Sequence, residues 1–241
     1  MAASTQDPAE IAKFSALAAE WWNPKGPFGA LHRLNPLRLQ YIRDTASAHF
    51  RLTTSPPLSG LSILDVGCGG GLVAAPLARM GAAVTGIDAS REAIGAARAY
   101  ADKAGLAISY DVAAVEELAE RRTTFDVITA LEIIEHVADI RIFLAAAARL
   151  VSAGGLLILS TINRTPKARA LAIVGAERVL KWAPEGAHDY DKLVTPEEIR
   201  AGAPDLSWDE PVGISYEPLG RGWALTRDTD INYLMTGRKP R

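Results

Sequence analysis

The chain alternates between apolar runs that favour β-strands and alanine-rich stretches that favour helices. The apolar runs lie at 61–66, 83–87, 125–130 and 155–162, with a weaker strand signal near 106–110. The helical stretches lie between them, at 71–80, 90–104 and 138–151. Such alternation is typical of an α/β fold, a mostly parallel sheet covered by helices on both faces. The pattern therefore predicts a Rossmann-like core over 61–163.

The N-terminal 60 residues follow a helical pattern instead. Residues 7–22 carry apolar side chains at helical spacing, and 37–50 also favour a helix. The stretch 23–36 holds three prolines and two glycines, so we expect an irregular loop there. Residues 1–60 are thus predicted to form a helical extension or lid.

After the predicted core, the sequence pattern is first helical and then strand-like. Residues 164–202 favour helices and are predicted to form a helical insertion. The C-terminal part, 203–241, holds strand-like runs at 211–217 and 230–237 with no helix between them. This order predicts an antiparallel hairpin at the sheet edge, within a single domain over 1–241.

Charge and cysteine content narrow the function classes. The 241 residues carry a formal net charge of −2, whereas proteins that bind nucleic acid nonspecifically usually carry a basic excess. The one cysteine, Cys68, allows no disulfide within the chain, as in a reducing compartment. The chain shows no signal-peptide pattern and no run of about 20 apolar residues. We expect no nucleic-acid partner and a cytoplasmic protein, free or peripheral on the inner face of the cell membrane.

A glycine-rich loop follows the first predicted strand, in the sequence ILDVGCGGG over 63–71. Glycines such as Gly67 and Gly69 let the backbone turn sharply and approach a ligand. A dinucleotide-binding loop needs a further glycine where this chain has Leu72. Asp65 at the lip of the loop would repel a pyrophosphate but suits the ammonium and sulfonium groups of S-adenosylmethionine. The alternative is a tight strand–helix turn that binds nothing.

An acidic residue stands at the end of the second predicted strand. Asp88 follows Gly67 by 21 residues, the position from which a carboxylate accepts the ribose hydroxyls of an adenosine. Its alternative role is to cap the next helix together with Ser90. The adenine wall is expected further along the same edge, at 113–115 with Leu131.

Two carboxylates and an imidazole follow the fourth predicted strand. In a helical turn Glu132, Glu135 and His136 would be i, i+3 and i+4 and would face one way. This set suits a divalent cation, Mg²⁺ or Mn²⁺, and also leaves Zn²⁺ or Fe²⁺ open. His136 is alternatively a general base, with an unperturbed pKa of about 6.5. A third interpretation is structural, with paired carboxylates and a helix-capping histidine.

The segment 164–182 combines five basic residues with apolar bulk and one acid, Glu177. Basic heads on an apolar body with a tryptophan suit an anionic lipid surface. An ordinary pair of packed helices over the active site explains the composition equally well.

Together these stretches resemble the ubiquinone-biosynthesis O-methyltransferases over nearly the whole chain. The resemblance is carried by 14–42, 63–71, 84–90, 131–137, 160–168, 186–199 and 230–235. The glycine loop and Glu135-His136-Val137 are shared by many methyltransferases. The opening that contains WWNP and LHRLNPLR, and the stretch from INR to HDYDK, are much more specific.

The resemblance implies a class I S-adenosylmethionine-dependent methyltransferase with a seven-stranded, mostly parallel sheet whose last strand is antiparallel. It implies O-methylation of a polyprenylated catechol and of a demethylated polyprenyl hydroquinone. In that family the positions of Arg38, Gly67, Asp88 and Leu131 contact S-adenosylmethionine, and a relative has methionine in place of Leu131.

Further expectations follow from the same resemblance. The positions of Glu132, Glu135 and His136 carry a divalent cation in relatives, and the segment corresponding to 164–188 associates with membranes. Other enzymes of quinone biosynthesis are implied as partners. Five residues of the opening, Phe14, Trp21, Trp22, Phe28 and His32, are candidates for an aromatic lid over the substrate ring.

Methyl transfer to oxygen is an in-line displacement, in which orientation supplies up to about 7–11 kcal/mol. A metal on the phenolic oxygen would lower its pKa. Three other functions remain open: a methyltransferase for another small phenol, a nicotinamide-dependent oxidoreductase, and a non-catalytic adenosyl-binding module.

Overall fold

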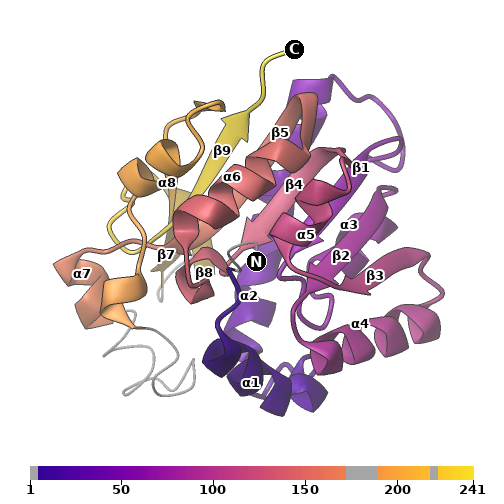
Figure 1. Ribbon diagram of the computed structural model, residues 1–241, viewed down its shortest axis with the longest axis horizontal. Coiled ribbons are helices and arrows are strands. Elements are labelled where there is room, and N and C mark those ends of the chain that lie inside the picture. Colours follow the sequence, from indigo (N-terminus) through magenta and orange to yellow (C-terminus); the bar gives the residue numbers. More distant parts are fainter. Residues whose placement is uncertain (1–4, 172–188, 218–221) are drawn as a thin grey trace.

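One sheet runs through the computed structural model, which describes residues 5–171, 189–217 and 222–241 (Figure 1). Within these residues the sheet has nine strands in the order β3-β2-β1-β4-β5-β9-β7-β8, with β6 paired to β9. The strands are β1 (Ser62–Val66), β2 (Ala83–Asp88), β3 (Ile108–Val112), β4 (Phe125–Leu131), β5 (Val151–Ile162), β6 (Ser207–Trp208), β7 (Val212–Glu217), β8 (Gly222–Thr226) and β9 (Asn232–Arg238). Strands β1 to β5 are parallel, and β9 is antiparallel to β5. The predicted α/β sheet with an antiparallel last strand is confirmed, with β6 and β8 in addition to the seven strands expected.

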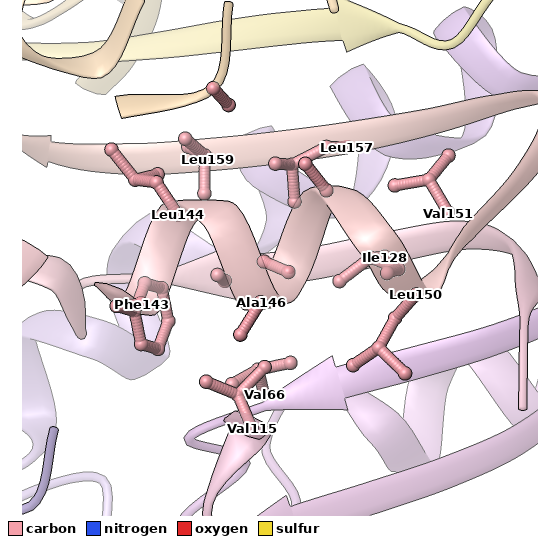
Figure 2. Packing of buried hydrophobic residues seen from close by; sticks show 14 of the residues in the cluster. Val66, Val115, Ile128, Phe143, Leu144, Ala146, Leu150, Val151, Leu157 and Leu159 are labelled. Atoms are coloured by element: carbon pink, nitrogen blue, oxygen red, sulfur yellow. The ribbon is translucent and has the colours of Figure 1, made fainter. Parts of the chain in front are cut away.

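Helices cover both faces of this sheet (Figure 1). They are α1 (Pro8–Ala16), α2 (Gly29–Phe50), α3 (Ala74–Arg79), α4 (Arg91–Ala104), α5 (Val115–Glu120), α6 (Ile140–Leu150), α7 (Pro166–Ala168) and α8 (Pro196–Gly202). Helices α5, α6 and α8 bury apolar side chains on one face, and α2, α3 and α4 do so on the other. Figure 2 shows the first of these cores, where Phe143 and Leu144 of α6 lie over the sheet.

The C-terminal hairpin lies in a different place from the one predicted. Strands β7 and β9 do pair antiparallel, with Gly213 opposite Tyr233, but β9 lies between β5 and β7. Tyr233 and Met235 are buried, and β9 is covered along nearly its whole length, which is typical of an interior strand. The edge is formed by β8, which the pattern analysis missed.

Helix α2 begins eight residues earlier than predicted and contains Pro36. Proline removes a hydrogen bond inside a helix, at a cost of about 3 kcal/mol. The face through Leu34, Arg38 and Ile42 is buried, and each fully buried large apolar side chain contributes about 1.5–3 kcal/mol. Packing against the sheet therefore outweighs the local preference of 29–36 for a loop.

Candidate active site

A pocket lies at the carboxyl ends of β1, β2 and β4, with about 800 Å³ of empty space that is partly open to solvent. Its lining includes Gly67, Asp88 and Ala113–Val115, together with Glu132 and His136 from the segment that follows β4. The N-terminal segment covers it with Ile11 and Phe14, among others.

The glycine loop is shaped by close neighbours. Gly67 has φ +68°, and a Cβ there would lie 2.7 Å from Ile133. Gly69 has φ +52°, and a Cβ there would lie 2.4 Å from the Trp21 ring. Side chains are excluded at both positions by backbone conformation and by contact. Gly67 lines the pocket, whereas the Gly69 N–H donates to Asp88 Oδ2 at 2.9 Å.

Asp88 lies in the pocket wall and holds the loop in place. Besides the Gly69 N–H, its carboxylate accepts the Ser90 N–H at 2.8 Å. Burial is the largest cause of a raised pKa for Asp88. Ser90 is the N-cap of α4 and accepts the Ala93 N–H at 3.1 Å, so Asp88 does not cap that helix. Its place in the pocket leaves the ribose assignment as the role to test.

Asp65 is not at the lip of the loop. It lies within β1 between Gly86 and Thr129 of the neighbouring strands and is 2 % exposed. Its Oδ1 accepts the Thr129 hydroxyl at 2.8 Å, while Oδ2 is buried without a hydrogen-bond partner. Burial raises the pKa of Asp65 to about 7. Asp65 is not among the residues that line the pocket, and its contact with the cofactor stays a prediction.

Arg38 and Leu131 also lie outside the pocket wall. Arg38 on α2 is 2 % exposed, and its Nη2 lies 2.6 Å from Glu132 Oε1. Leu131 ends β4 and packs on apolar side chains of the sheet and α2. The expected adenine wall at 113–115 does line the pocket, and Ile133 lines it where Leu131 was expected. Contacts of Arg38 and Leu131 with the cofactor stay predictions.

Glu132, Glu135 and His136 do not share one helical turn. Glu132 has φ +52° and precedes the 3₁₀ turn Ile134–His136, so the three side chains take different directions and partners. Glu132 accepts from Ser160 Oγ at 2.7 Å and from Asn232 Nδ2 at 3.2 Å, in addition to its ion pair with Arg38.

A cation site at these three residues does not fit the arrangement. The charge of Glu132 is neutralised by Arg38, and His136 Nδ1 lies 2.9 Å from Glu10 Oε2. Glu135 is buried, accepts from Thr161 through Oε2, and has no partner at Oε1. Within the described ranges no group of three or more His, Cys, Asp or Glu side chains converges closely enough to hold a metal ion.

The buried Glu135 predicts how stability depends on pH. Burial, and then the nearby Glu132 carboxylate, raise its pKa from 4.5 to about 8. The unfolded chain ionises near the ordinary value, so between these limits the folded protein holds more protons. The free energy of unfolding therefore falls as the pH rises from about 5 to about 8. Glu135→Gln removes this ionisation and should make the fall less steep, while Asp65, whose pKa burial raises to about 7, keeps a comparable contribution.

Thermal unfolding between pH 5 and 8, in steps, measures this slope for both proteins. Glu197→Gln is the control, because that carboxyl is 77 % exposed. Identical slopes for wild type and Glu135→Gln would show that Glu135 ionises normally in the fold.

The aromatic residues of the opening gather over the glycine loop. Phe14 meets the His136 ring edge-on at 5.1 Å, and Trp21 stacks on Phe28 at 3.7 Å. Trp22 stacks on a tyrosine of α4, and its Nε1 donates to the Gly70 carbonyl at 2.9 Å. Of these, Phe14 and Trp21 line the pocket. These aromatic side chains therefore lie against both the loop and the pocket, and their role as a lid over the substrate ring stays a prediction.

Sequence reasoning missed the polar contacts of the N-terminal segment. The Thr5 N–H donates to Glu116 Oε1 at 2.6 Å, and Glu10 meets His136. Lys192 Nζ lies 3.0 Å from Asp7 Oδ2. The helical pattern of 7–22 was the one available signal, and it does not specify which side chains these residues meet.

Solved structures share this fold. The chain aligns with the plantazolicin methyltransferase BpumL in complex with SAH at a TM-score of 0.64 and 17 % identity, covering 97 % of this chain and 98 % of that one. It aligns with magnesium protoporphyrin IX methyltransferase (ChlM) from Synechocystis PCC 6803 with bound SAM at a TM-score of 0.59 and 17 % identity, covering 99 % of both. At such identities the likeness shows the fold alone.

Sequence relatives are much closer. Residues 64–159 match the family model described as a methyltransferase domain. The ubiquinone biosynthesis O-methyltransferase of Rhizobium etli (strain CIAT 652) is 49 % identical over 99 % of this chain and 98 % of its own length. That of Maricaulis maris (strain MCS10) is 51 % identical, over 97 % and 93 %. At this identity over nearly its full length, the chain belongs to the ubiquinone biosynthesis O-methyltransferase family.

Proposed function

We propose that this enzyme transfers the methyl group of S-adenosylmethionine to a phenolic hydroxyl of polyprenylated ubiquinone precursors, a catechol and a demethylated hydroquinone. One observation carries the proposal beyond the names of its relatives. The same pocket is lined by the Asp88 carboxylate, which we assign to the ribose, and by the His136 imidazole, which we assign to proton transfer. The groups that we assign to the adenosine and to the acidic hydroxyl therefore line one pocket.

The reaction follows from this placement. Asp88 and the wall at 113–115 hold the adenosine, and Gly67 lets the methionine part approach the loop. The substrate hydroxyl lies against His136 and loses its proton to the imidazole as its oxygen attacks the methyl carbon. The C–S bond breaks, its electron pair returns to sulfur, and the sulfonium becomes a neutral thioether.

Besides proton transfer, this displacement requires that water is kept away from the reacting atoms, and the N-terminal lid provides this. The methyl group has to be transferred to the phenol and not to water. In addition, a phenolate is a better nucleophile when it is desolvated. Ile11, Phe14 and Trp21 bring apolar surface to the pocket from the N-terminal segment. With the lid closed, the reacting atoms lie in a mostly apolar enclosure.

Methyl transfer to a short-chain polyprenyl catechol tests the proposal. We expect O-methylated product that depends on S-adenosylmethionine. Tight S-adenosylhomocysteine binding without transfer would indicate a different acceptor, and stabilisation by NAD instead would indicate an oxidoreductase. The same assay in EDTA, and then with added Mg²⁺, tests whether Glu132 can leave its ion pair with Arg38 and bind a cation. If EDTA abolishes methyl transfer and Mg²⁺ restores it, Glu132 has to make that change of partner.

We also propose that 164–188 contacts an anionic membrane, where the polyprenyl tail of the substrate resides. Residues 172–188 lie outside the described residues. Within the described part, Leu171 is 52 % exposed, while Arg164 and Lys167 are paired with Glu198 and Asp228. Among residues 5–171, 189–217 and 222–241, no helix has the length and hydropathy that a membrane span requires.

Replacing 172–182 with a glycine–serine linker of equal length should reduce flotation with vesicles that contain anionic lipid. The change removes apolar bulk and two basic residues, Arg178 and Lys181, and each basic residue near such a surface contributes about 1 kcal/mol. Flotation with anionic and with neutral vesicles gives the measurement, and S-adenosylhomocysteine affinity is the folding control. Equal flotation of both proteins would refute the membrane contact.

A further inference from the structure

We infer that Thr5 and Glu116 form a latch that holds the N-terminal strap, residues 5–16, closed over the pocket, and that opening of this strap sets how fast the cofactor exchanges. In Figure 1 the strap is the indigo ribbon that leads into α1. It contributes to the pocket lining along its length, from Thr5 to Phe14. The inference rests on the proposed cofactor site and adds the step by which a ligand enters and leaves it.

The latch joins one carboxylate to two donors of a single residue. The Thr5 N–H donates to Glu116 Oε1 at 2.6 Å, and the Thr5 hydroxyl donates to Oε2 at 2.8 Å. Hydrogen bonds to a carboxylate are roughly twice as strong as those between neutral groups. Thr5 is only 4 % exposed, and its carbonyl accepts the Ala138 N–H at 2.9 Å. Every polar group of Thr5 therefore has a partner, either on α5 or on the segment after β4.

Glu116 is firmly placed beside the expected adenine wall. It lies in the first turn of α5, directly after Val115 of the pocket lining. Val115, Leu118 and Ala119 of the same helix are buried in the core. The latch therefore ties the strap to a helix that the core holds in place.

Helix α1 is held by polar contacts more than by apolar packing. None of residues 8–16, which the structure describes in full, is fully buried. Ile11 and Phe14 are half-buried and line the pocket. A segment with few buried apolar contacts opens at a low cost in free energy. The next segment differs, because Trp21 stacks on Phe28 and both are buried. Helix α1 can therefore open while this aromatic pair stays in place.

The latch lies at the end of the strap farthest from the aromatic pair, where opening displaces the chain most. Further polar contacts tie the strap down nearer to that pair, from Asp7 to Lys192, from Glu10 to His136 and from Ser15 to Ser90. Opening from the far end breaks the latch before it breaks these contacts. The strength of the latch therefore sets how often the strap opens.

The latch acts as a gate and not as a contact with the ligand. Glu116 is not among the described residues that line the pocket. Because both partners of the latch are protein groups, the same latch has to break when a ligand enters and when it leaves. Loss of the latch should therefore raise the association and dissociation rate constants together and leave Kd nearly unchanged.

Three variants test the latch. Glu116→Ala removes both of its acceptors. Thr5→Val removes the hydroxyl donor, keeps the N–H donor and retains the shape of the side chain. Glu117→Ala is the matched control, because Glu117 is an exposed carboxyl in the same first turn of α5, where both acids interact alike with the helix dipole.

We expect Glu116→Ala to raise both rate constants for S-adenosylhomocysteine about 10- to 100-fold, with Kd changed less than about threefold. Thr5→Val should raise them about 3- to 10-fold, and Glu117→Ala less than about twofold. In the Glu116→Ala protein, Thr5→Val should add less than about 1.5-fold, because both changes remove one interaction. Stopped-flow binding, and a chase of the bound ligand with excess S-adenosylmethionine, give the two rate constants.

Two kinetic results would overturn the inference. Rate constants in Glu116→Ala that equal those of wild type would show that the strap does not limit exchange. A dissociation rate constant and a Kd that rise equally, with an unchanged association rate constant, would show that Glu116 supports the bound ligand and gates nothing.

Amide hydrogen exchange tests the latch without any ligand. An isolated helix as short as α1 is marginal in water, so a detached α1 exchanges its amides. These amides should exchange about 10- to 100-fold faster in Glu116→Ala than in wild type, and those of 18–28 should be unchanged. Equal exchange of α1 in both proteins would overturn the inference. If wild type binds no S-adenosylhomocysteine, the proposed function fails, while the exchange of α1 still decides the role of Glu116.

Discussion

Asp88→Ala should weaken the binding of S-adenosylhomocysteine by about 100- to 10,000-fold. A carboxylate that accepts two ribose hydroxyls makes two charge-assisted hydrogen bonds of about 1.5–3 kcal/mol each, and each 1.4 kcal/mol is about a factor of ten in affinity. Asp88 lies in the pocket wall and also accepts the Gly69 and Ser90 N–H groups, so its loss loosens the loop as well. Isothermal titration calorimetry measures the change.

A control variant separates the ribose contact from a general loss of negative charge at this edge of the sheet. Asp111, on the neighbouring strand β3, is half exposed and lies 3.3 Å from Arg121, outside the pocket wall. Asp111→Ala should leave the affinity within about twofold, because an exposed pair contributes little. Unchanged affinity in Asp88→Ala would rule out the ribose assignment.

His136→Asn should lower kcat by about 100- to 10,000-fold, the usual contribution of a general base. Asparagine retains a polar side chain in the wall but accepts no proton near neutral pH. Cofactor affinity should change little, since we assign the adenosine to Asp88 and the lining at 113–115 and not to His136. Single-turnover methyl transfer at saturating cofactor isolates the chemical step from binding.

The same substitution at His49 is the matched control. His49 Nε2 donates to the Gly154 carbonyl at 2.8 Å and Nδ1 lies 2.6 Å from Arg238, at the edge of the sheet opposite the pocket. His49→Asn should leave kcat unchanged even if it lowers the unfolding temperature. A His136→Asn enzyme with kcat within threefold of wild type would mean that the substrate loses its proton elsewhere.

The local order of the core was readable from the sequence. Periodicity, turn residues and strand-end chemistry depend on neighbours along the chain, so the alternation of β1 to β5 with helices and the sharp turn at Gly67 followed from them. The placement of Asp88 followed too, because parallel strands end at one edge of a sheet. The resemblance of the chain to the ubiquinone-biosynthesis O-methyltransferases rests on these stretches in part, and more specifically on the opening over 14–42 and the stretch from INR to HDYDK.

Tertiary packing overruled local preference in two places. The stretch 29–36 has loop-forming residues, but burial of one face against the sheet makes it part of α2. Asp65 stands next to the glycine loop in sequence, yet its side chain is buried and accepts the Thr129 hydroxyl of the neighbouring strand β4. In both cases the apolar or desolvating surroundings come from residues far away in the chain, which no local pattern contains.

The side-chain partners of the site were decided by the tertiary structure alone. Spacing placed Glu132 and His136 on one helical face, whereas a left-handed residue at Glu132 turns them apart. Arg38 then neutralises Glu132, and Glu10 meets His136, across separations that sequence cannot bridge. The sequence by itself determined the fold class, the cofactor edge and the family. The packing of α1 and α2 onto that edge decided which charged side chains pair with each other. Such pairs form between groups that are close in space, and that closeness depends on the tertiary structure.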